Sequence, residues 1–473
     1  AAVHQKASEP LLPESDQTGG RAGRPKRTGT LGADGSRRFQ TEVKGTVPDE
    51  GGISMLPYQD KKMRTDRDIL RELVSQYAEF AYSAKNAEKL RLHRAVNDLS
   101  MIRPIVLIDE IPWHEMELEQ ELTLQCSDPD FRALEEELRH TLYQLRHMPA
   151  DLAVPTSINV MKVIHNSGIG IEVSEETLGA EGEINSHRYH NMLEDQDLSL
   201  LHNPVIIYDE EESLRKWDKI GRAVGDIMPV RLTGEATGYG LGCKTWDTIS
   251  TLMGVDNLLY GLIDEPDFMH TLVEKLTDIF CSTIEQYASL NLIDTDALYC
   301  HSASATTSGM PKEAADYEHV NLKKVWGRGI AQIFSTVSPE MHDEFDIQYM
   351  KRALAPFGHV YYGCCEPLDQ KIDILRQISN LRKISITPWA DIRNAARQIR
   401  KDYVISSKPN PAQLSLGVLN RPAVTSELSN ILDACRENGC SVELVLKDIS
   451  TVGGNPRCLF EWEKLAMELV ENY

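Results

Sequence analysis

Two kinds of hydrophobic pattern alternate along the chain from residue 204 to the C-terminus. Short, nearly continuous apolar runs are typical of strands buried on both faces, whereas apolar residues at every third or fourth position are typical of helices. The short runs predict strands at residues 204–208, 230–234, 297–301, 330–335, 359–364, 383–386, 403–406 and 441–446. The periodic segments predict helices at residues 212–224, 245–262, 265–290, 339–354, 368–378, 390–399, 426–437 and 459–471.

This alternation of strand and helix predicts the fold class. Each helix connects two neighbouring parallel strands, so the pattern indicates an α/β protein with a parallel sheet. About seven or eight such units over about 270 residues favour a closed (β/α)8 TIM barrel at residues 204–473. An open, doubly wound sheet is the alternative, but no G-x-G-x-x-G loop follows a strand to support a dinucleotide-binding version of it.

The chain before residue 204 lacks the regular alternation, and we expect residues 55–203 to form an N-terminal helical and cap segment. Its patterns predict helices at 67–99 and 130–148, a strand at 104–109, a hairpin at 154–173 and a polar loop at 174–201. Residues 1–54 are rich in Gly, Arg, Pro and Ser without an apolar period, which predicts a disordered leader. Because the first methionine is Met55, we expect this leader not to be native.

Composition limits the kinds of partner that the protein can bind and indicates the cellular compartment in which it works. The 473 residues carry a formal net charge of −22, with a sequence pI of about 5.1. Such an acidic chain argues against a nucleic-acid or anionic-membrane partner, and no apolar run reaches the roughly 18 residues of a membrane span. The 9 cysteines are scattered and odd in number, which favours reduced thiols and a cytoplasmic protein.

The predicted strand at 359–364 ends in Cys364, Cys365 and Glu366. Residues at the carboxyl end of a barrel strand face the mouth where chemistry is done. Two thiols and a carboxylate there suit a soft metal ion. The alternative is packing, because free cysteine is often a small buried hydrophobe. Side chains alternate along a strand, so we expect only one of the two thiols to face the mouth.

Other chemically active residues follow the remaining predicted strands. Zinc takes thiolate, imidazole and carboxylate ligands, and the candidates are His301, Cys364, Cys365 and Glu366. The candidate catalytic carboxylates are Glu235 and Asp448. The candidate substrate-binding residues are Gln332, Trp389, Asp391, Lys408 and Asn410. Each also has a structural interpretation, as a hydrogen-bonded histidine, a packed indole, a local ion pair or a turn.

Residues 337–345 (VSPEMHDEF) followed by 349–352 (YMKR) resemble a helix of the uroporphyrinogen decarboxylase superfamily. The strand that ends in Tyr362, Gly363, Cys364 and Cys365 lies where cobalamin-dependent methyltransferases of that superfamily carry a His-x-Cys-Gly zinc motif. Residues 446–451 (LKDIST) with 456–457 (PR) also resemble a branch of these proteins. The resemblance covers residues 204–473.

The resemblance implies a TIM barrel and one of two activities. One group of the superfamily decarboxylates a porphyrinogen without a cofactor, and another transfers methyl groups between a corrinoid protein and a small substrate or thiol with zinc. The decarboxylases carry an R-Q-A-G-R motif, whose only counterpart here, at residues 21–24 (RAGR), lies in the leader. The thiols favour the methyltransferase branch.

This chain departs from the family pattern, because Tyr362 stands where the family has its zinc-binding histidine. Either His301 supplies the imidazole, or Cys365 is the ligand in a shifted register, or this branch has lost the metal. No D-x-H-x-x-G cobalamin-binding sequence is present, so a corrinoid would come on a separate protein.

The resemblance therefore implies a zinc-dependent methyltransferase that acts on a small methyl donor or acceptor with a separate corrinoid protein. The alternatives are a cofactor-free decarboxylase or lyase and a non-catalytic barrel that binds a small molecule. The sequence leaves a homodimer open.

Overall fold

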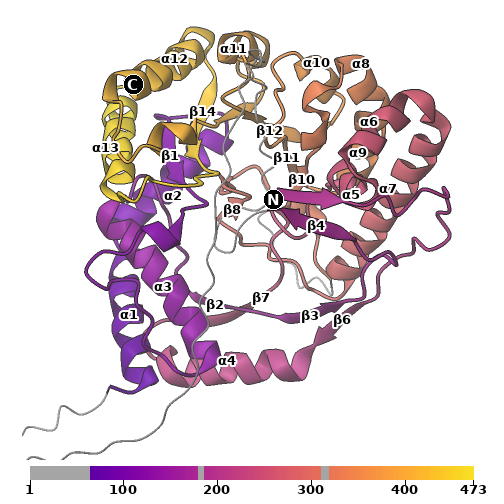
Figure 1. The fold of residues 1–473 in the computed structure, drawn as a ribbon. Coiled ribbons are helices and arrows are strands. Elements are labelled where there is room, and N and C mark those ends of the chain that lie inside the picture. The colour runs from indigo at the N-terminus through magenta and orange to yellow at the C-terminus, as the bar shows by residue number, and fades with distance from the viewer. Residues whose placement is uncertain (1–63, 179–185, 311–318) are drawn as a thin grey trace, which may run out of the picture. The chain divides into compact units, whose positions relative to one another are not determined.

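A parallel sheet of six strands forms the centre of the fold, in the order β1-β14-β13-β12-β11-β10 (Figure 1). Every neighbouring pair in this sheet is parallel. The computed structural model describes residues 64–178, 186–310 and 319–473. The predicted leader and its boundary at Met55 lie outside these residues. The strands are β1 (Ile105–Ile108), β10 (Trp326–Gly329), β11 (His359–Tyr362), β12 (Leu381–Ile386), β13 (Val404–Ser407) and β14 (Ser441–Leu446).

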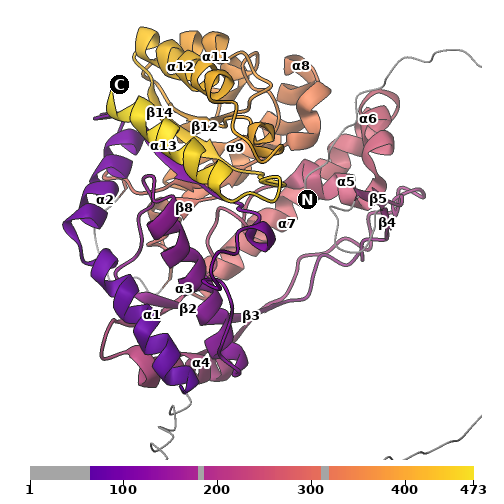
Figure 2. The ribbon, with the colours of Figure 1, turned by 60° about the vertical axis from the view of Figure 1, so that its left-hand side comes forward.

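Three helices connect the last four strands of this sheet, as the alternating pattern predicted: α10 (Ile372–Leu375), α11 (Ile392–Ile399) and α12 (Arg421–Asn438). A fourth helix, α13 (Arg457–Glu471), follows β14. Helices α12 and α13 lie side by side (Figure 2), and α13 also contacts β1. Because residues of β14 are buried on both faces, its sequence reads as a nearly continuous apolar run. The α/β class and the parallel sheet are therefore confirmed.

The remaining strands form short pairs. β2 (Ile158–Met161) is parallel to β7 (Val230–Thr233), and β3 (Val163–Asn166) is antiparallel to β6 (Ile206–Asp209). Isolated parallel bridges join Cys243 to Gly329 and Glu235 to Ile293. Within the described residues, no continuous ladder joins the edge strands β1 and β10, so a closed eight-stranded barrel stays a prediction.

The N-terminal segment contributes a strand to the central sheet, because β1 pairs with β14. The segment also contains α1 (Asp66–Ala81), α2 (Ala84–Asn97) and α3 (Pro129–His147), and α2 contacts β1. The prediction of one helix over 67–99 is wrong, since Ser83 has an extended backbone and caps α2 by accepting a hydrogen bond from the amide of Asn86. A serine at an N-cap starts a new helix because its hydroxyl satisfies a free amide.

Several other element predictions are wrong, each for a local reason. The hairpin at 154–173 does not form, because β2 and β3 pair with β7 and β6 instead of with each other. The polar loop at 174–201 contains an antiparallel pair, β4 (Glu175–Leu178) and β5 (Ser186–Tyr189). The helix at 245–262 divides into α5 (Thr245–Met253) and α6 (Val255–Asp264) at Gly254, whose φ is +77°.

Three errors lie close to the candidate site. The strand predicted at 330–335 is displaced to β10, and the turn of 3-10 helix η3 (Gln332–Thr336) occupies most of the predicted range. The helix predicted at 368–378 shortens to α10. The helix predicted at 339–354 is interrupted by the π-helical turn η4 (Asp343–Ile347), between α8 (Pro339–His342) and α9 (Gln348–Leu354).

Among the described residues, none of the helices combines the length and the hydrophobicity that a membrane span requires.

Candidate functional site

The two adjacent cysteines lie after a sharp turn at the end of β11. Gly363 has a φ of +94°, and a Cβ at this position would lie 2.4 Å from Cδ1 of Leu368, so only glycine fits. The turn takes Cys364 and Cys365 out of the strand, and their sulfur atoms lie 3.6 Å apart. The prediction that the two thiols face opposite sides is therefore wrong. Cys364 is 6% exposed, whereas Cys365 is exposed.

The imidazole of His301 contacts the Cys364 thiol, with its Nε2 3.6 Å from Sγ. His301 directly follows the short strand β8 (Tyr299–Cys300) and has a φ of +52°. The ring of Tyr239 meets the imidazole edge-on at 5.0 Å. A positive φ is unfavourable for a histidine, and such backbone conformations are concentrated at functional sites.

A lysine and two carboxylates complete the surroundings of Cys364. The ammonium of Lys447 lies 3.8 Å from Sγ of Cys364 and 2.8 Å from Oδ2 of Asp448. Glu110, which follows β1, accepts a hydrogen bond of 3.0 Å from the amide of Asp448. Sγ of Cys365 lies 3.9 Å from Oδ2 of Asp448. Glu110 and Asp448 have φ values of +50° and +56°, so three non-glycine residues around this site have positive φ.

The environment favours an anionic sulfur at Cys364. The hydrogen bond from the Cys365 thiol, with the imidazole of His301 and the charges of Arg328 and Lys447, holds the pKa of Cys364 well below its usual range despite burial. A thiolate is the form of cysteine that acts as a nucleophile or a metal ligand.

Glu366 is completely buried behind the cysteines. Its carboxyl group accepts hydrogen bonds from the amides of Cys364, at 2.9 Å, and Ala331, at 3.4 Å. Burial, followed by the negative charge at Cys364, raises the pKa of Glu366 to about 7. These contacts tie together the chain segments that follow β10 and β11.

The donors around Cys364 suit zinc in kind and in pairwise spacing. A tetrahedral zinc ion with Zn–S bonds of about 2.3 Å and Zn–N bonds of about 2.0 Å places its donors about 3.5–3.8 Å apart. The distances from Cys364 to His301 and to Cys365 are both 3.6 Å. However, no three His, Cys, Asp or Glu side chains of the described residues already surround one point as a metal site. Zinc binding would require Cys365 and His301 to turn toward a common centre.

The other predicted site residues have different surroundings. Gln332 hydrogen-bonds the carboxyl group of Asp247, a residue of α5 whose pKa responds to Cys364. Lys408 is buried, and its ammonium donates to Oγ of Ser406 at 2.7 Å. Glu235 is half-buried, its pKa is raised by burial, and its amide donates to the carbonyl of Leu292.

The last three predicted residues lie on the loops after β12 and β13. Trp389 is 72% exposed. Asp391 caps α11 through the amides of Arg393 and Asn394, and Asn410 caps the turn η5 (Pro411–Leu414). In the described part of the chain, the side-chain contacts recorded for Asp391 and Asn410 are these caps, so both have a structural role.

Sequence reasoning missed Glu110, Arg328 and Asp247. Glu110 directly follows a predicted strand and could have been found by the rule that singled out Asp448. Arg328 lies inside β10, which was predicted at a later position. Asp247 lies on a helix, and no strand-end rule points to it.

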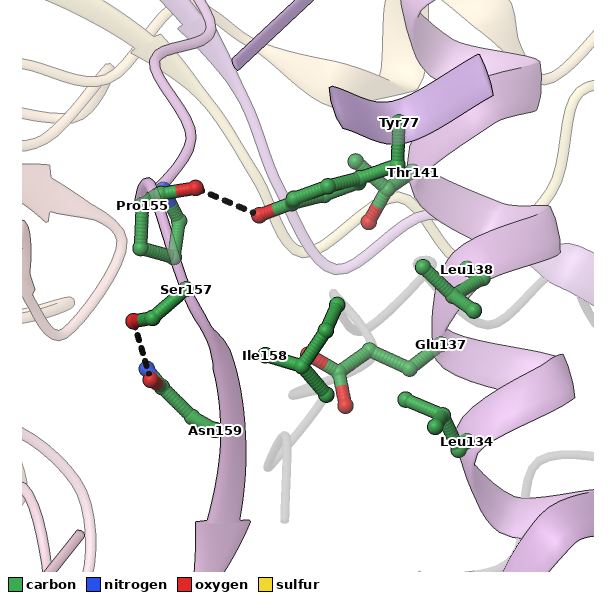
Figure 3. A pocket seen from close by; sticks show the side chains of 9 residues that line it. All are labelled: Tyr77, Leu134, Glu137, Leu138, Thr141, Pro155, Ser157, Ile158 and Asn159. Atoms are coloured by element: carbon green, nitrogen blue, oxygen red, sulfur yellow. Dashed lines mark hydrogen bonds between the residues drawn. The ribbon is translucent and has the colours of Figure 1, made fainter. Parts of the chain in front are cut away.

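A small hollow between α1, α3 and β2 lies outside this cluster and is shown in Figure 3. It is lined by Tyr77, Leu134, Glu137, Leu138, Thr141, Pro155, Ser157, Ile158 and Asn159. The hydroxyl of Tyr77 donates to the carbonyl of Pro155 at 3.2 Å. The lining contains neither a thiol nor an imidazole, so the chemistry discussed below concerns the Cys364 cluster.

Comparisons with known proteins give little about function. No family model matches the chain, and no curated protein matches it. Among solved structures, 19 chains match. One is titled "methyltransferase from Methanosarcina mazei"; the match covers 80% of this chain and 97% of that chain, with 12% identity and a TM-score of 0.43. A similarity of this size carries no information about substrate or mechanism.

Proposed function

We propose that the Cys364 cluster is the active site of a TIM-barrel methyltransferase that moves a methyl group between a small substrate and a separate corrinoid protein. The observation that carries the proposal is the contact between Cys364 and His301 at 3.6 Å. Both residues were singled out in the sequence by their positions after strands. A sulfur and an imidazole in contact at that position match the donor types expected from the resemblance.

Zinc is the proposed cofactor, held by Cys364 and His301 with Cys365 as the third donor. When bound, zinc would stabilise a substrate thiol as its thiolate or polarise a leaving group as a Lewis acid. The departure at Tyr362 then has a simple reading: His301 supplies the imidazole in place of the family's histidine. The hydroxyl of Tyr362 instead donates to Oδ2 of Asp346 at 2.6 Å.

The protein's own residues would control charge and protons at this site. Arg328 and Lys447 stabilise negative charge on sulfur, and Glu366 fixes the turn that presents Cys364. Asp448, 2.8 Å from Lys447, lies at the exposed side of the cluster. Its Oδ2 lies 3.9 Å from Sγ of Cys365, and we assign it the removal of a proton from an incoming substrate. Glu235, which shows no contact with the cluster in the described residues, would act only after movement of its loop.

The test is a methyl-transfer assay with free methylcobalamin as donor and 2-mercaptoethanol as acceptor, followed by the absorbance of methylcobalamin. We expect stoichiometric zinc in the purified protein and consumption of methylcobalamin. We expect both to be lost in Cys364→Ala and retained in Cys458→Ala, a buried cysteine on α13 whose thiol contacts the carbonyl of Leu414. Equal zinc content and equal rates in the two variants would remove Cys364 from the mechanism.

A cofactor-free decarboxylase or lyase is the second candidate, because Arg328 places a buried positive charge beside the cluster. It predicts loss of carbon dioxide from a small acid that continues after chelation. A protein that binds small molecules but shows neither reaction would favour a non-catalytic barrel.

A further inference from the structure

The sulfur atoms of Cys364 and Cys365 are within reach of a bond to each other. They lie 3.6 Å apart, and a disulfide length of about 2.05 Å would require them to approach by about 1.5 Å. Both residues follow β11, which ends at Tyr362. The amide of Cys364 donates to the Glu366 side chain rather than to a neighbouring strand. The two residues can therefore shift without loss of a hydrogen bond in the β11 ladder.

One sulfur of this pair meets solvent, and the other lies behind it. Cys365 is exposed, so a small oxidant can reach it, whereas Cys364 is 6% exposed. The ammonium of Lys447 and the imidazole of His301 lie 3.8 and 3.6 Å from Sγ of Cys364. An accessible thiol beside a second thiol that can displace the oxidised group is the arrangement found in redox-sensing cysteines. The pair at the end of β11 has both parts of this arrangement.

A second pair of cysteines in the same chain provides a comparison. Cys435, near the end of α12, and Cys440, just before β14, interact through their side chains. They are 0% and 2% exposed, and Sγ of Cys440 lies 3.5 Å from the carbonyl oxygen of Ala396. Because an oxidant in solution reaches neither sulfur, we expect this buried pair to stay reduced under conditions that oxidise the exposed pair.

We propose that Cys364 and Cys365 are a reversible modification site, at which a hydroperoxide converts the two thiols into a disulfide between adjacent residues. The Cα atoms of adjacent residues are about 3.8 Å apart, below the roughly 4.4–6.8 Å of ordinary disulfides. The bond is therefore strained, and a small thiol in solution reduces it easily. The disulfide itself does not depend on the proposed reaction.

The oxidation proceeds in two steps. Sγ of Cys365 attacks the outer oxygen of the hydroperoxide, the O–O bond breaks, and the thiol proton leaves with the departing oxygen as water or an alcohol. Cys365 is then a sulfenic acid. Sγ of Cys364 attacks Sγ of Cys365, the S–O bond breaks, and the hydroxide leaves as water with the Cys364 proton. Together the two thiols lose two electrons, which reduce the hydroperoxide.

Only the consequence of this oxidation rests on the proposed function. A sulfur committed to a disulfide is no longer a thiolate, and the thiolate is the form that binds a metal ion. The disulfide would therefore remove Cys364 and Cys365 from the proposed zinc site, release the metal and stop methyl transfer until a thiol reduces the bond.

The test is a thiol count by mass spectrometry on the whole protein as purified, treated with hydrogen peroxide, denatured, alkylated with N-ethylmaleimide and digested with trypsin. Trypsin cuts after Arg352 and Lys371, so residues 353–371 contain Cys364 and Cys365 and no other cysteine. We expect this peptide to lose two hydrogen atoms and to take up no N-ethylmaleimide. After treatment with dithiothreitol it should take up two. A peptide that still carries two alkylated thiols after peroxide would overturn the proposal, as would sulfinic acid without disulfide.

The buried cysteines are the internal control in the same digest. Cys435 and Cys440 lie on separate peptides, because trypsin cuts after Arg436, so a disulfide between them would join two peptides. We expect the disulfide of Cys364 and Cys365 to form at least about tenfold faster, because only this pair has an exposed sulfur. Equal rates for the two pairs would contradict the assignment of a specific site.

Variants separate the two steps of the oxidation. In Cys364→Ser, the sulfenic acid at Cys365 has no adjacent thiol to displace it, so dimedone should trap it. In the wild-type protein, the disulfide should form before dimedone reacts. The matched control is Cys281→Ser, since Cys281 is a partly exposed cysteine on α7 (Pro266–Ser289), and its disulfide at 353–371 should form as in the wild type. Equal trapping in Cys364→Ser and the wild type would refute the role of Cys364.

Zinc released during the same peroxide treatment is followed with a coloured chelator. Release in step with the disulfide, and recovery after reduction, are the expected results. A disulfide that forms in a protein without zinc, or without release of its zinc, would refute the proposed cofactor alone. Release of zinc from a protein whose 353–371 peptide still carries two alkylated thiols would refute the disulfide alone.

Discussion

Two groups of buried charges on the same sheet differ in how completely they are paired. In the interior pair, the ammonium of Lys383 on β12 lies 2.8 Å from the carboxylate of Glu443 on β14, and both are 0% exposed. Ser304 and Ser406 donate to the two carboxylate oxygens at 2.6 and 2.7 Å. In the Cys364 cluster, Arg328 and Asp247 each keep an unpaired buried atom.

The difference indicates what each region is for. A buried ion pair whose hydrogen bonds are all made holds strands together and needs nothing further. A cluster with unpaired charges and three strained backbone positions is maintained at a cost in stability, as is typical of functional sites. The interior pair is therefore structural, and the incomplete pairing of the Cys364 cluster supports our proposal that it is the functional site.

The largest effect should come from breaking the interior pair. Lys383→Met removes the cation that contacts the buried Glu443 carboxylate, which should cost about 3–5 kcal/mol of unfolding free energy. Urea unfolding measures the loss. The double variant Lys383→Met/Glu443→Leu should recover much of it, because both charges are then absent. A double variant as unstable as the single one would contradict this description of the pair.

The two buried glutamates should respond to pH in opposite directions. Burial raises the pKa of Glu366 from 4.5 to about 7. Its contribution to stability is therefore full below about pH 4.5 and is lost as the pH rises through 7, by up to about 3 kcal/mol. Glu366→Gln should remove this loss. The measurement is urea unfolding from about pH 3 to about pH 8, a range that covers the titration of both glutamates.

Glu443 provides the matched control for this experiment. Burial alone would raise the pKa of Glu443, but the charges of Lys383 and Lys408 hold it below 4.5. Its contribution is present above pH 4.5 and is lost as the pH falls through the lowered pKa. If Glu366→Gln and Glu443→Gln change the pH dependence in the same direction, the contrast between the two regions is wrong.

Removing the unpaired guanidinium should cost less than breaking the interior pair. Arg328→Gln loses hydrogen bonds to backbone carbonyls but leaves no carboxylate without its cation, so we expect a loss of about 1 kcal/mol. The same urea experiment as for Lys383→Met gives the comparison. A loss as large as that of Lys383→Met would show that Arg328 belongs to the structural framework.

The smallest effect on stability should come from the exposed indole of Trp389. Trp389, after β12, is 72% exposed, so Trp389→Ala should change the unfolding free energy by less than about 0.5 kcal/mol. The control is Trp246→Ala, since Trp246 is 0% exposed and its loss should cost about 3–5 kcal/mol. A large destabilisation by Trp389→Ala would place this indole in the packed core and end its assignment to substrate binding.

The sequence predicted the sheet and the contact of Cys364 with His301 because both follow from chain order. The rule that strand ends gather at one edge of the fold selected both residues, although β8, which precedes His301, pairs only with the short antiparallel strand β9 (Ala303–Ser304) in the described residues. The orientation of the Cys365 side chain could not be predicted from the alternation of side chains along a strand. The strand ends at Gly363, two residues earlier than the apolar run suggested.

Two residues of the site, Arg328 and Asp247, lie on elements that the sequence rules do not identify as part of a site. The strand β10 reads Trp-Gly-Arg-Gly, and glycine and a buried arginine are both unfavourable in strands. The apolar segment that follows it has a better strand pattern but forms the 3-10 turn η3. Arg328 was therefore missed, and Asp247 could be found only from the tertiary contact of α5 with the sheet edge.

The most direct test of the account is titration of the metal-free protein with Co2+, followed by absorbance. A cobalt ion bound by a thiolate gives an intense sulfur-to-metal charge-transfer band, whereas oxygen and nitrogen ligands do not. We predict such a band at one equivalent in the wild-type protein, its loss in Cys364→Ser, and its retention in Cys458→Ser. A band of equal intensity in Cys364→Ser, or no band in the wild-type protein, would contradict the claim that Cys364 is a metal-binding sulfur.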